Sequence, residues 1–170
     1  MAHLGVHFVL TSDQRENLLA RADDSARLDY VQEHIEEAWD RDNAYETDKA
    51  WYAIHCCLTG TQRSRWPEVD TLAGAYPLNQ CFLGARSLYE GRDYVINLIE
   101  PATLRDLNAS LAQVDREWLM EAYMKHEPRP WPVSNDAEDF EYTWEYFQGL
   151  KSFLLQKQET GRSLIFTVDL

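Results

Sequence analysis

This sequence of 170 residues lacks the features that mark membrane and secreted proteins. No apolar run approaches the roughly 18 residues that a membrane span needs, so we expect no membrane partner. The first residues, MAHLGVHFVLTSD, have no basic region, and their apolar stretch is short and runs into polar residues. A signal peptide has both a basic start and a longer apolar segment. The stretch therefore predicts a first strand and a cytoplasmic protein.

Cysteine is scarce, with Cys56, Cys57 and Cys81 as the complete set. An odd number with two neighbours and no C-x-x-C spacing makes a poor disulfide framework and a poor metal site. Cys56 and Cys57 lie in an apolar stretch, where thiols usually act as small hydrophobic side chains. We therefore expect buried cysteines, no disulfide and a reducing compartment.

Catalytic and cofactor motifs are missing as well. The sequence contains no G-x-G-x-x-G, no Gly-Lys-Ser/Thr phosphate loop and no H-E-x-x-H. His3 and His7 share one side of a predicted strand, but four strand residues span roughly 13 Å, which is too far for one metal ion. We therefore predict no catalytic residue, no metal and no cofactor, and we favour a protein without enzymatic activity.

Basic residues are outnumbered, with 16 lysines and arginines against 29 acids and a net charge of −13. Residues 11–48 alone hold twelve acids and four bases. Such an acidic field repels nucleic acid and attracts basic proteins. The sequence therefore predicts a basic protein partner and no nucleic acid, although acidity can also serve solubility alone.

Three β-rich segments, 3–10, 93–99 and 163–169, are separated by helical patterns. Helices are expected after a capping box at Thr11 and Gln14, from about Ser25, and over 49–58 with Asp48 as N-cap. Further helices are expected from Pro101, over 115–125 and over 137–158. Residues 80–84 fit either a short strand or a helical turn. Length and pattern predict one domain, residues 1–170, of the α/β (or α+β) class, with a small mixed sheet between helical layers.

The second predicted helix has two stripes of side chains. Its buried stripe is expected to contain Leu28, Val31, Ile35 and Trp39. A neighbouring stripe, rotated by about 100°, is expected to face water and to bind a basic partner. The residues predicted for this partner-binding stripe are Asp29, Glu33, Glu36, Glu37 and Asp40.

The last predicted helix interleaves acids and aromatics. Its core face is expected to contain Phe140, Trp144, Phe147, Leu150 and Leu154. The opposite side carries acids and a tyrosine, and tyrosine supplies contact area at low entropy cost. The residues predicted to bind the partner here are Glu138, Glu141, Tyr142 and Glu145. An ordinary solvated face is the alternative interpretation.

Residues 48–61, DKAWYAIHCCLTGT, form the most distinctive run. One interpretation places His55 in a pocket with Arg63 and Arg86, as the site of a small enzyme or ligand-binding domain. The other makes the run a core helix in which His55 is structural and donates to a backbone carbonyl. The second interpretation is favoured, since no spacing fixes a catalytic partner for His55.

The same run resembles the D-K-x-W-x-x-x-H-x-x-L-T-G-T motif of the YfbM-like family, a bacterial domain of unknown function. The segment from Pro77-Leu78 to Leu83-Gly84, the W-P stretch near Trp131, the long aromatic helix and the closing strand are also similar. The resemblance implies a three-layer α/β/α fold. It implies no activity and no role for His55.

Three hypotheses for function follow. The first is an acidic, non-catalytic protein-binding module, most concretely a bacterial immunity protein that neutralises a basic cognate toxin. The second is the small enzyme or ligand-binding domain with a pocket around His55, Arg63 and Arg86. The third is a structural subunit of a homo-oligomer, and the sequence leaves the oligomeric state open.

Overall fold

The structure, a computed structural model, describes residues 3–61, 74–125 and 137–170. Within them, one five-stranded sheet has the strand order β2-β1-β5-β4-β3. Its strands are β1 (Val6–Val9), β2 (Ala44–Glu46), β3 (Arg86–Ser87), β4 (Tyr94–Ile99) and β5 (Leu164–Asp169). All four pairings are antiparallel, so the prediction of a mixed sheet is wrong in this respect.

The three predicted strands are β1, β5 and β4, which form the centre of the sheet. The two edge strands, β2 and β3, have three and two residues and were not predicted. Such short strands carry no alternation that a sequence pattern can reveal, and their pairing with distant segments decides their conformation. Of the ambiguous residues 80–84, the first two end a 3-10 turn, η2 (Leu78–Cys81), and the other three continue as a turn, so the helical-turn alternative is confirmed and no strand forms.

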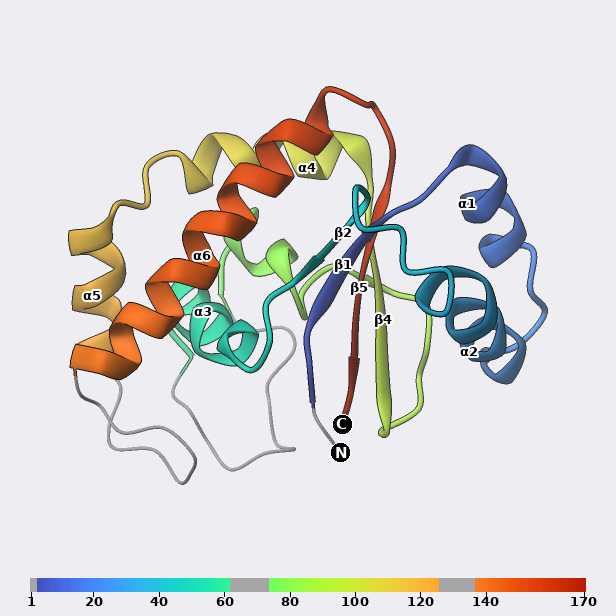
Figure 1. Cartoon of the computed structure of the whole chain (residues 1–170), viewed down its shortest axis with the longest axis horizontal. Helices are drawn as coiled ribbons and strands as arrows, with labels where there is room; N and C mark the ends of the chain where they lie inside the picture. The colour runs from blue at the N-terminus through green and yellow to red at the C-terminus, as the bar shows by residue number, and fades with distance from the viewer. Residues whose placement is uncertain (1–2, 62–73, 126–136) are drawn as a thin grey trace.

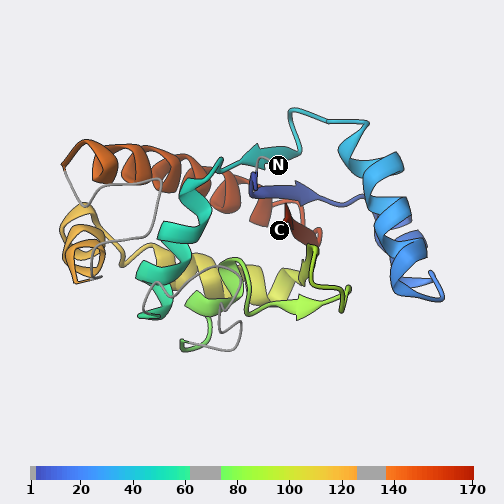
Figure 2. The ribbon, with the colours of Figure 1, turned by 90° about the horizontal axis from the view of Figure 1, so that it is seen from below.

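Helices cover both faces of the sheet, as Figures 1 and 2 show. One face is covered by α1 (Ser12–Leu19), α2 (Asp24–Val31) and a π-helical segment, η1 (Gln32–Glu36). The other face is covered by α3 (Ala50–Thr59), α4 (Pro101–Leu111), α5 (Arg116–Met124) and α6 (Ala137–Gln158). The predicted three-layer α/β/α architecture is therefore confirmed.

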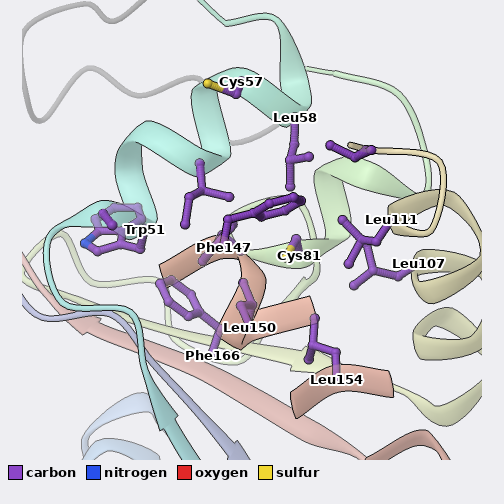
Figure 3. Packing of buried hydrophobic residues seen from close by; sticks show 14 of the residues in the cluster. Trp51, Cys57, Leu58, Cys81, Leu107, Leu111, Phe147, Leu150, Leu154 and Phe166 are labelled. Carbon is purple, nitrogen blue, oxygen red and sulfur yellow. The ribbon is translucent and has the colours of Figure 1, made fainter. Parts of the chain in front are cut away.

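The alternation of β5 shows how one strand serves both layers. Phe166 and Val168 belong to the larger core beneath α3–α6, whereas Ile165 belongs to the smaller core beneath α1, α2 and η1. Successive strand residues point to opposite faces, so a strand buried on both sides must be apolar throughout. The ring centroids of Phe166 and of Trp51 of α3 lie 5.6 Å apart, and Figure 3 shows both in the larger core together with Phe147 of α6.

Helix ends explain where the chain turns. The Thr11 side chain accepts from the Gln14 backbone and the Gln14 side chain accepts from the Thr11 backbone, which confirms the predicted capping box. Gly60 ends α3 in the left-handed conformation, with φ of 69°, as its position predicted. Asp48 does not cap α3: its φ is 46°, and Lys49 occupies the N-cap position without a side-chain bond.

Candidate functional site

The acidic stripe of the second helix is only partly what its spacing predicted. Asp29, Glu33 and Glu37 are exposed. Glu36, in contrast, accepts hydrogen bonds from the hydroxyls of Tyr94 and Thr167 on the sheet. The chain changes from α-helical to π-helical geometry at Gln32, where the Glu37 amide bonds to the Gln32 carbonyl. Each π-helical residue advances less around the axis, so the prediction that Glu36 faces water is wrong.

The same stripe also ends earlier than predicted. The helical segment stops at Glu36, and Trp39 has a φ of 34°. Trp39 is 39% exposed, so it is not part of a buried stripe, although its ring meets the edge of Phe8. Asp40 is exposed, but it accepts bonds from the Asn43 side chain and the Asp42 amide in the following turn. A continuous acidic stripe therefore does not extend to Asp40.

The acidic row of α6 follows its prediction more closely. Glu138 and Glu145 are exposed, and Glu141 forms an ion pair with Arg116 of α5. Tyr142 is half-buried, and its hydroxyl donates to the Asp48 carboxylate at 2.8 Å. Of the predicted core face, Phe140, Phe147, Leu150 and Leu154 are fully buried and Trp144 is partly buried. The 22 residues of α6 keep one helical period, which keeps the row on the outside.

The two predicted stripes lie in different layers. α2 and η1 pack on one face of the sheet and α6 packs on the other, at opposite sides of the molecule in Figure 1. The structure therefore does not combine the nine predicted residues into one surface.

A more compact site forms where β2 and the turn before α3 meet the first half of α6. We call it the acid–tyrosine surface. It consists of Tyr45, Glu46, Asp48, Tyr142, Glu145 and Tyr146. The rings of Tyr142 and Tyr146 meet edge to face, with centroids 4.9 Å apart. The Tyr45 hydroxyl donates to the Tyr146 carbonyl at 3.2 Å.

The pKa values of two of these tyrosines reflect the nearby carboxylates. Burial, followed by the charges of Asp48, Glu46 and Glu145, raises the pKa of Tyr146. Burial and the hydrogen bond to Asp48 raise the pKa of Tyr142. A negative environment opposes formation of a phenolate and favours a nearby cation. The surface is therefore chemically matched to lysine and arginine side chains.

Gly149 allows β2 and α6 to approach each other. A Cβ atom built there would lie 1.8 Å from the Tyr45 hydroxyl oxygen, so any larger residue would displace that ring. Four members of the surface, Tyr45, Glu46, Asp48 and Tyr146, were not predicted to bind a partner. Tyr146 follows Tyr142 by one helical turn, which is a signal that the sequence offers. Tyr45 and Glu46 come from a strand that the sequence does not reveal.

A groove continues from this surface along β2. Its volume is about 560 Å³, and it lies between β2 and the second half of α6. Its lining residues are Arg41, Asp42, Ala44, Tyr45, Ser152, Phe153, Gln156 and Lys157. The rings of Tyr45 and Phe153 stack at 5.6 Å.

The alternative site around His55 does not assemble in the described residues. His55 is fully buried on α3 beside Phe82, whereas Arg86 is exposed on β3. No hydrogen bond, ion pair or ring contact joins the two, and Arg63 lies outside the described residues. Neither ring nitrogen of His55 finds a partner among those residues, so the predicted bond to a carbonyl is wrong. Burial lowers the pKa of His55 to about 4.

His7 is the second buried histidine of the larger core. Its Nε2 lies 2.8 Å from the Cys81 carbonyl. A carbonyl only accepts, so the proton is on Nε2. Burial lowers the pKa of His7 to about 4, although this bond opposes the shift. The two strand histidines do not meet at one site, since the Nδ1 of His3 faces the Asp169 carbonyl instead.

The three cysteines are buried, as predicted. Among the described residues, no group of three histidine, cysteine or acidic side chains could hold a metal ion. In the same part of the chain, none of the helices combines the length and the apolar character that crossing a membrane requires.

Comparisons with known proteins agree with the resemblance seen in the sequence. Residues 1–167 match the family described as "Domain of unknown function (DUF1877)". The chain belongs to the DUF1877 family. The crystal structure of YfbM from Escherichia coli, a protein of unknown function, is similar at 20% sequence identity with a TM-score of 0.68. The match covers 97% of this chain and 99% of that chain. At this identity it supports only the fold of this DUF1877 protein. No curated protein matches the chain.

Proposed function

We propose that this DUF1877 protein is a non-catalytic binding module that captures a basic protein. The acid–tyrosine surface supports the proposal, because it places three carboxylates around two tyrosine rings that meet edge to face. Tyrosine offers a large contact area with few rotatable bonds, and nearby carboxylates attract lysine and arginine. Compact geometry favours this surface over the predicted stripe on α2, which has Glu36 turned inward.

The most concrete form of the proposal is a bacterial immunity protein that neutralises a basic cognate toxin in the cytoplasm. A net charge of −13 on 170 residues favours rapid capture, because long-range attraction raises association rates. An inhibitor needs no chemistry of its own, so it needs surface complementarity and speed. Three buried cysteines suit the reducing interior of a cell.

The proposal is tested by capture from lysate of the source cell, followed by titration of the purified partner. Two double variants carry the same change in charge at opposite sides of the molecule. Glu46→Lys with Glu145→Lys alters the acid–tyrosine surface, and Asp29→Lys with Glu33→Lys alters the exposed face of α2 and η1. We expect the first variant to weaken binding at least tenfold, which is about 1.4 kcal/mol, and the second to leave it nearly unchanged.

Equal weakening by both variants would mean that net charge alone drives association. If Asp29→Lys with Glu33→Lys weakens binding more than the first variant does, the binding site lies on α2 and η1 instead. A captured partner without a basic face, or none that binds the purified parent protein, would remove the proposal.

A small ligand bound near His55 is the second candidate function. The observation in its favour is a buried imidazole whose nitrogens have no hydrogen-bond partner in the described residues, an arrangement that costs stability. A screen with small polar ligands, read by thermal shift on the parent protein and on His55→Leu, distinguishes the two candidates. Stabilisation of the parent alone would favour a ligand site.

A further inference from the structure

No described strand pairs with the outer edge of β2, and the backbone pairing of β2 shows which groups point outward. His7 pairs with Tyr45. The Val9 amide bonds to the Asn43 carbonyl at 2.8 Å, and the Thr47 amide bonds to the Gly5 carbonyl at 2.7 Å. In an antiparallel ladder, alternate residues bond to one neighbour, so the intervening residues direct their N–H and C=O groups away from it.

Ala44 and Glu46 are those intervening residues. They pair with Phe8 and Val6, which bond to β5 on the far side of β1. β2 is the last strand in the sheet order, so no described strand lies beyond it. Ala44 and Glu46 therefore direct two N–H and two C=O groups away from β1, on the side where no described strand pairs with β2. An edge with such groups is a template for one more strand.

The groove beside α6 can accept the side chains of an added strand. Ala44 and Tyr45 line it from the strand, and Ser152, Phe153 and Gln156 line it from the helix. The stacked rings of Tyr45 and Phe153 provide an apolar floor. The amide of Gln156 and the hydroxyl of Ser152 provide polar contacts. This combination is typical of sites where backbone bonds give affinity and side-chain pockets give specificity.

The charges along this edge are not uniform. At the Glu46 end lies the acid–tyrosine surface, where Glu46, Asp48 and Glu145 act on Tyr146. At the other end lie Arg41 and Lys157, neither of which forms an ion pair within the described residues. Asp42 also lines that end, and Asp40 interacts electrostatically with Lys157, so the positive charge of the two cations is largely offset there. A strand antiparallel to β2 would begin at the acidic end and finish at the end with the two cations.

We propose that an extended segment of the basic partner adds to β2 as a sixth, antiparallel strand. An arginine or lysine near the start of the segment lies on the acid–tyrosine surface, and a carboxylate near its end faces Arg41 and Lys157. The proposal rests on the proposed function, because it assumes a basic partner, and it adds the conformation and the direction of the bound segment.

Amide hydrogen exchange at Ala44 and Glu46 tests the proposal directly. The probe is an acetylated hexapeptide of arginine, valine, threonine, valine, threonine and glutamate. A second peptide has the same side chains but methyl groups on alternate backbone nitrogens, which removes the bonds and keeps the charges. A third has arginine and glutamate exchanged. We expect the first peptide to slow exchange of both amides by at least about tenfold at saturation. The other two peptides should leave the exchange of both amides unchanged.

Two variants provide the matched test on the protein. Ala44→Pro removes one outward N–H at an edge position, where proline is tolerated best, and should weaken binding of the first peptide. Asp29→Lys with Glu33→Lys should leave binding of that peptide unchanged. If Ala44→Pro does not fold, the methylated peptide still isolates the contribution of the backbone.

Three results would overturn strand addition. The first is equal binding of the methylated peptide, and the second is binding without protection of Ala44 and Glu46. If Glu46→Lys with Glu145→Lys abolishes that binding, the acid–tyrosine surface survives and the added strand does not. The third is protection of both amides in the free protein that increases with concentration, because it would identify a second copy of this chain as the occupant.

Discussion

The two helical layers contact the same sheet in different ways. Within the described residues, the core beneath α3–α6 contains 26 buried residues and the core beneath α1, α2 and η1 contains 12. The larger core buries two imidazoles, those of His7 and His55. On the smaller side, a carboxylate, Glu36, reaches the sheet and accepts bonds from Tyr94 and Thr167. We therefore expect most of the stability to come from the layer of α3–α6. The polar groups buried in that layer are imidazoles, whereas the polar group that reaches the sheet from the other layer is a carboxylate.

The largest expected difference between the two layers is the loss of stability at acidic pH, because both buried histidines lie in the larger core. The pKa values of His7 and His55 are about 4 in the fold, below the usual 6.5, so the unfolded chain binds protons more tightly. Stability is therefore complete above pH 6.5 and is lost as the pH falls towards 4. The loss is about 3 kcal/mol for each histidine. Urea unfolding at pH 7 and pH 4 measures it.

Variants assign that pH dependence to its residues. His55→Leu should remove about half of the acid-induced loss, whereas replacement of the exposed His34 by glutamine should remove none. If the parent and His55→Leu lose the same stability between pH 7 and pH 4, the buried imidazoles are not its cause.

Cavities should also cost more in the larger core. Leu150 of α6 and Leu18 of α1 are both fully buried. We expect Leu150→Ala to cost about 4–5 kcal/mol and Leu18→Ala about 2–3 kcal/mol, because a short peripheral helix can shift into the space that the leucine leaves. Chemical denaturation of both variants checks the order. The comparison of the layers fails if the two costs are equal or reversed.

The inward turn of Glu36 gives the next largest effect. Glu36→Ala leaves the hydroxyls of Tyr94 and Thr167 without their acceptor, so we expect a loss of about 1–3 kcal/mol. Glu33→Ala is the matched control, because it removes the same charge from an exposed position three residues earlier. Similar stabilities for the two variants would show that Glu36 is an ordinary surface acid.

These particular residues also show how far the sequence determines the fold. α6 occupies the predicted residues, 137–158, because one apolar period continues over its whole length. β4 and β5 match their predicted segments closely, since they are apolar and bounded by turn residues. A switch to π-helical geometry leaves no such periodic signal, and for that reason the orientation of Glu36 was predicted wrongly.

The candidate site was predictable only on its helical side. Tyr142 and Glu145 follow from the period of α6, but Tyr45 and Glu46 reach the site through pairing between β2 and β1. That pairing joins residues about forty positions apart, which local pattern does not encode. The lack of a hydrogen-bond partner for His55 within the described residues likewise depends on tertiary packing. The local sequence does not determine whether a carbonyl lies within reach of its ring.

The association rate with a purified basic partner tests the acid–tyrosine surface most directly. Stopped-flow measurements at rising salt compare the parent, Glu46→Lys with Glu145→Lys, and Asp29→Lys with Glu33→Lys. The Debye length falls from ~10 Å at 0.1 M salt to ~3 Å at 1 M salt, so association of the parent should slow as the salt concentration rises. At low salt we expect the first variant to associate at least about tenfold more slowly and the second to stay near the parent. Equal rates for the two variants at every salt concentration would contradict the account.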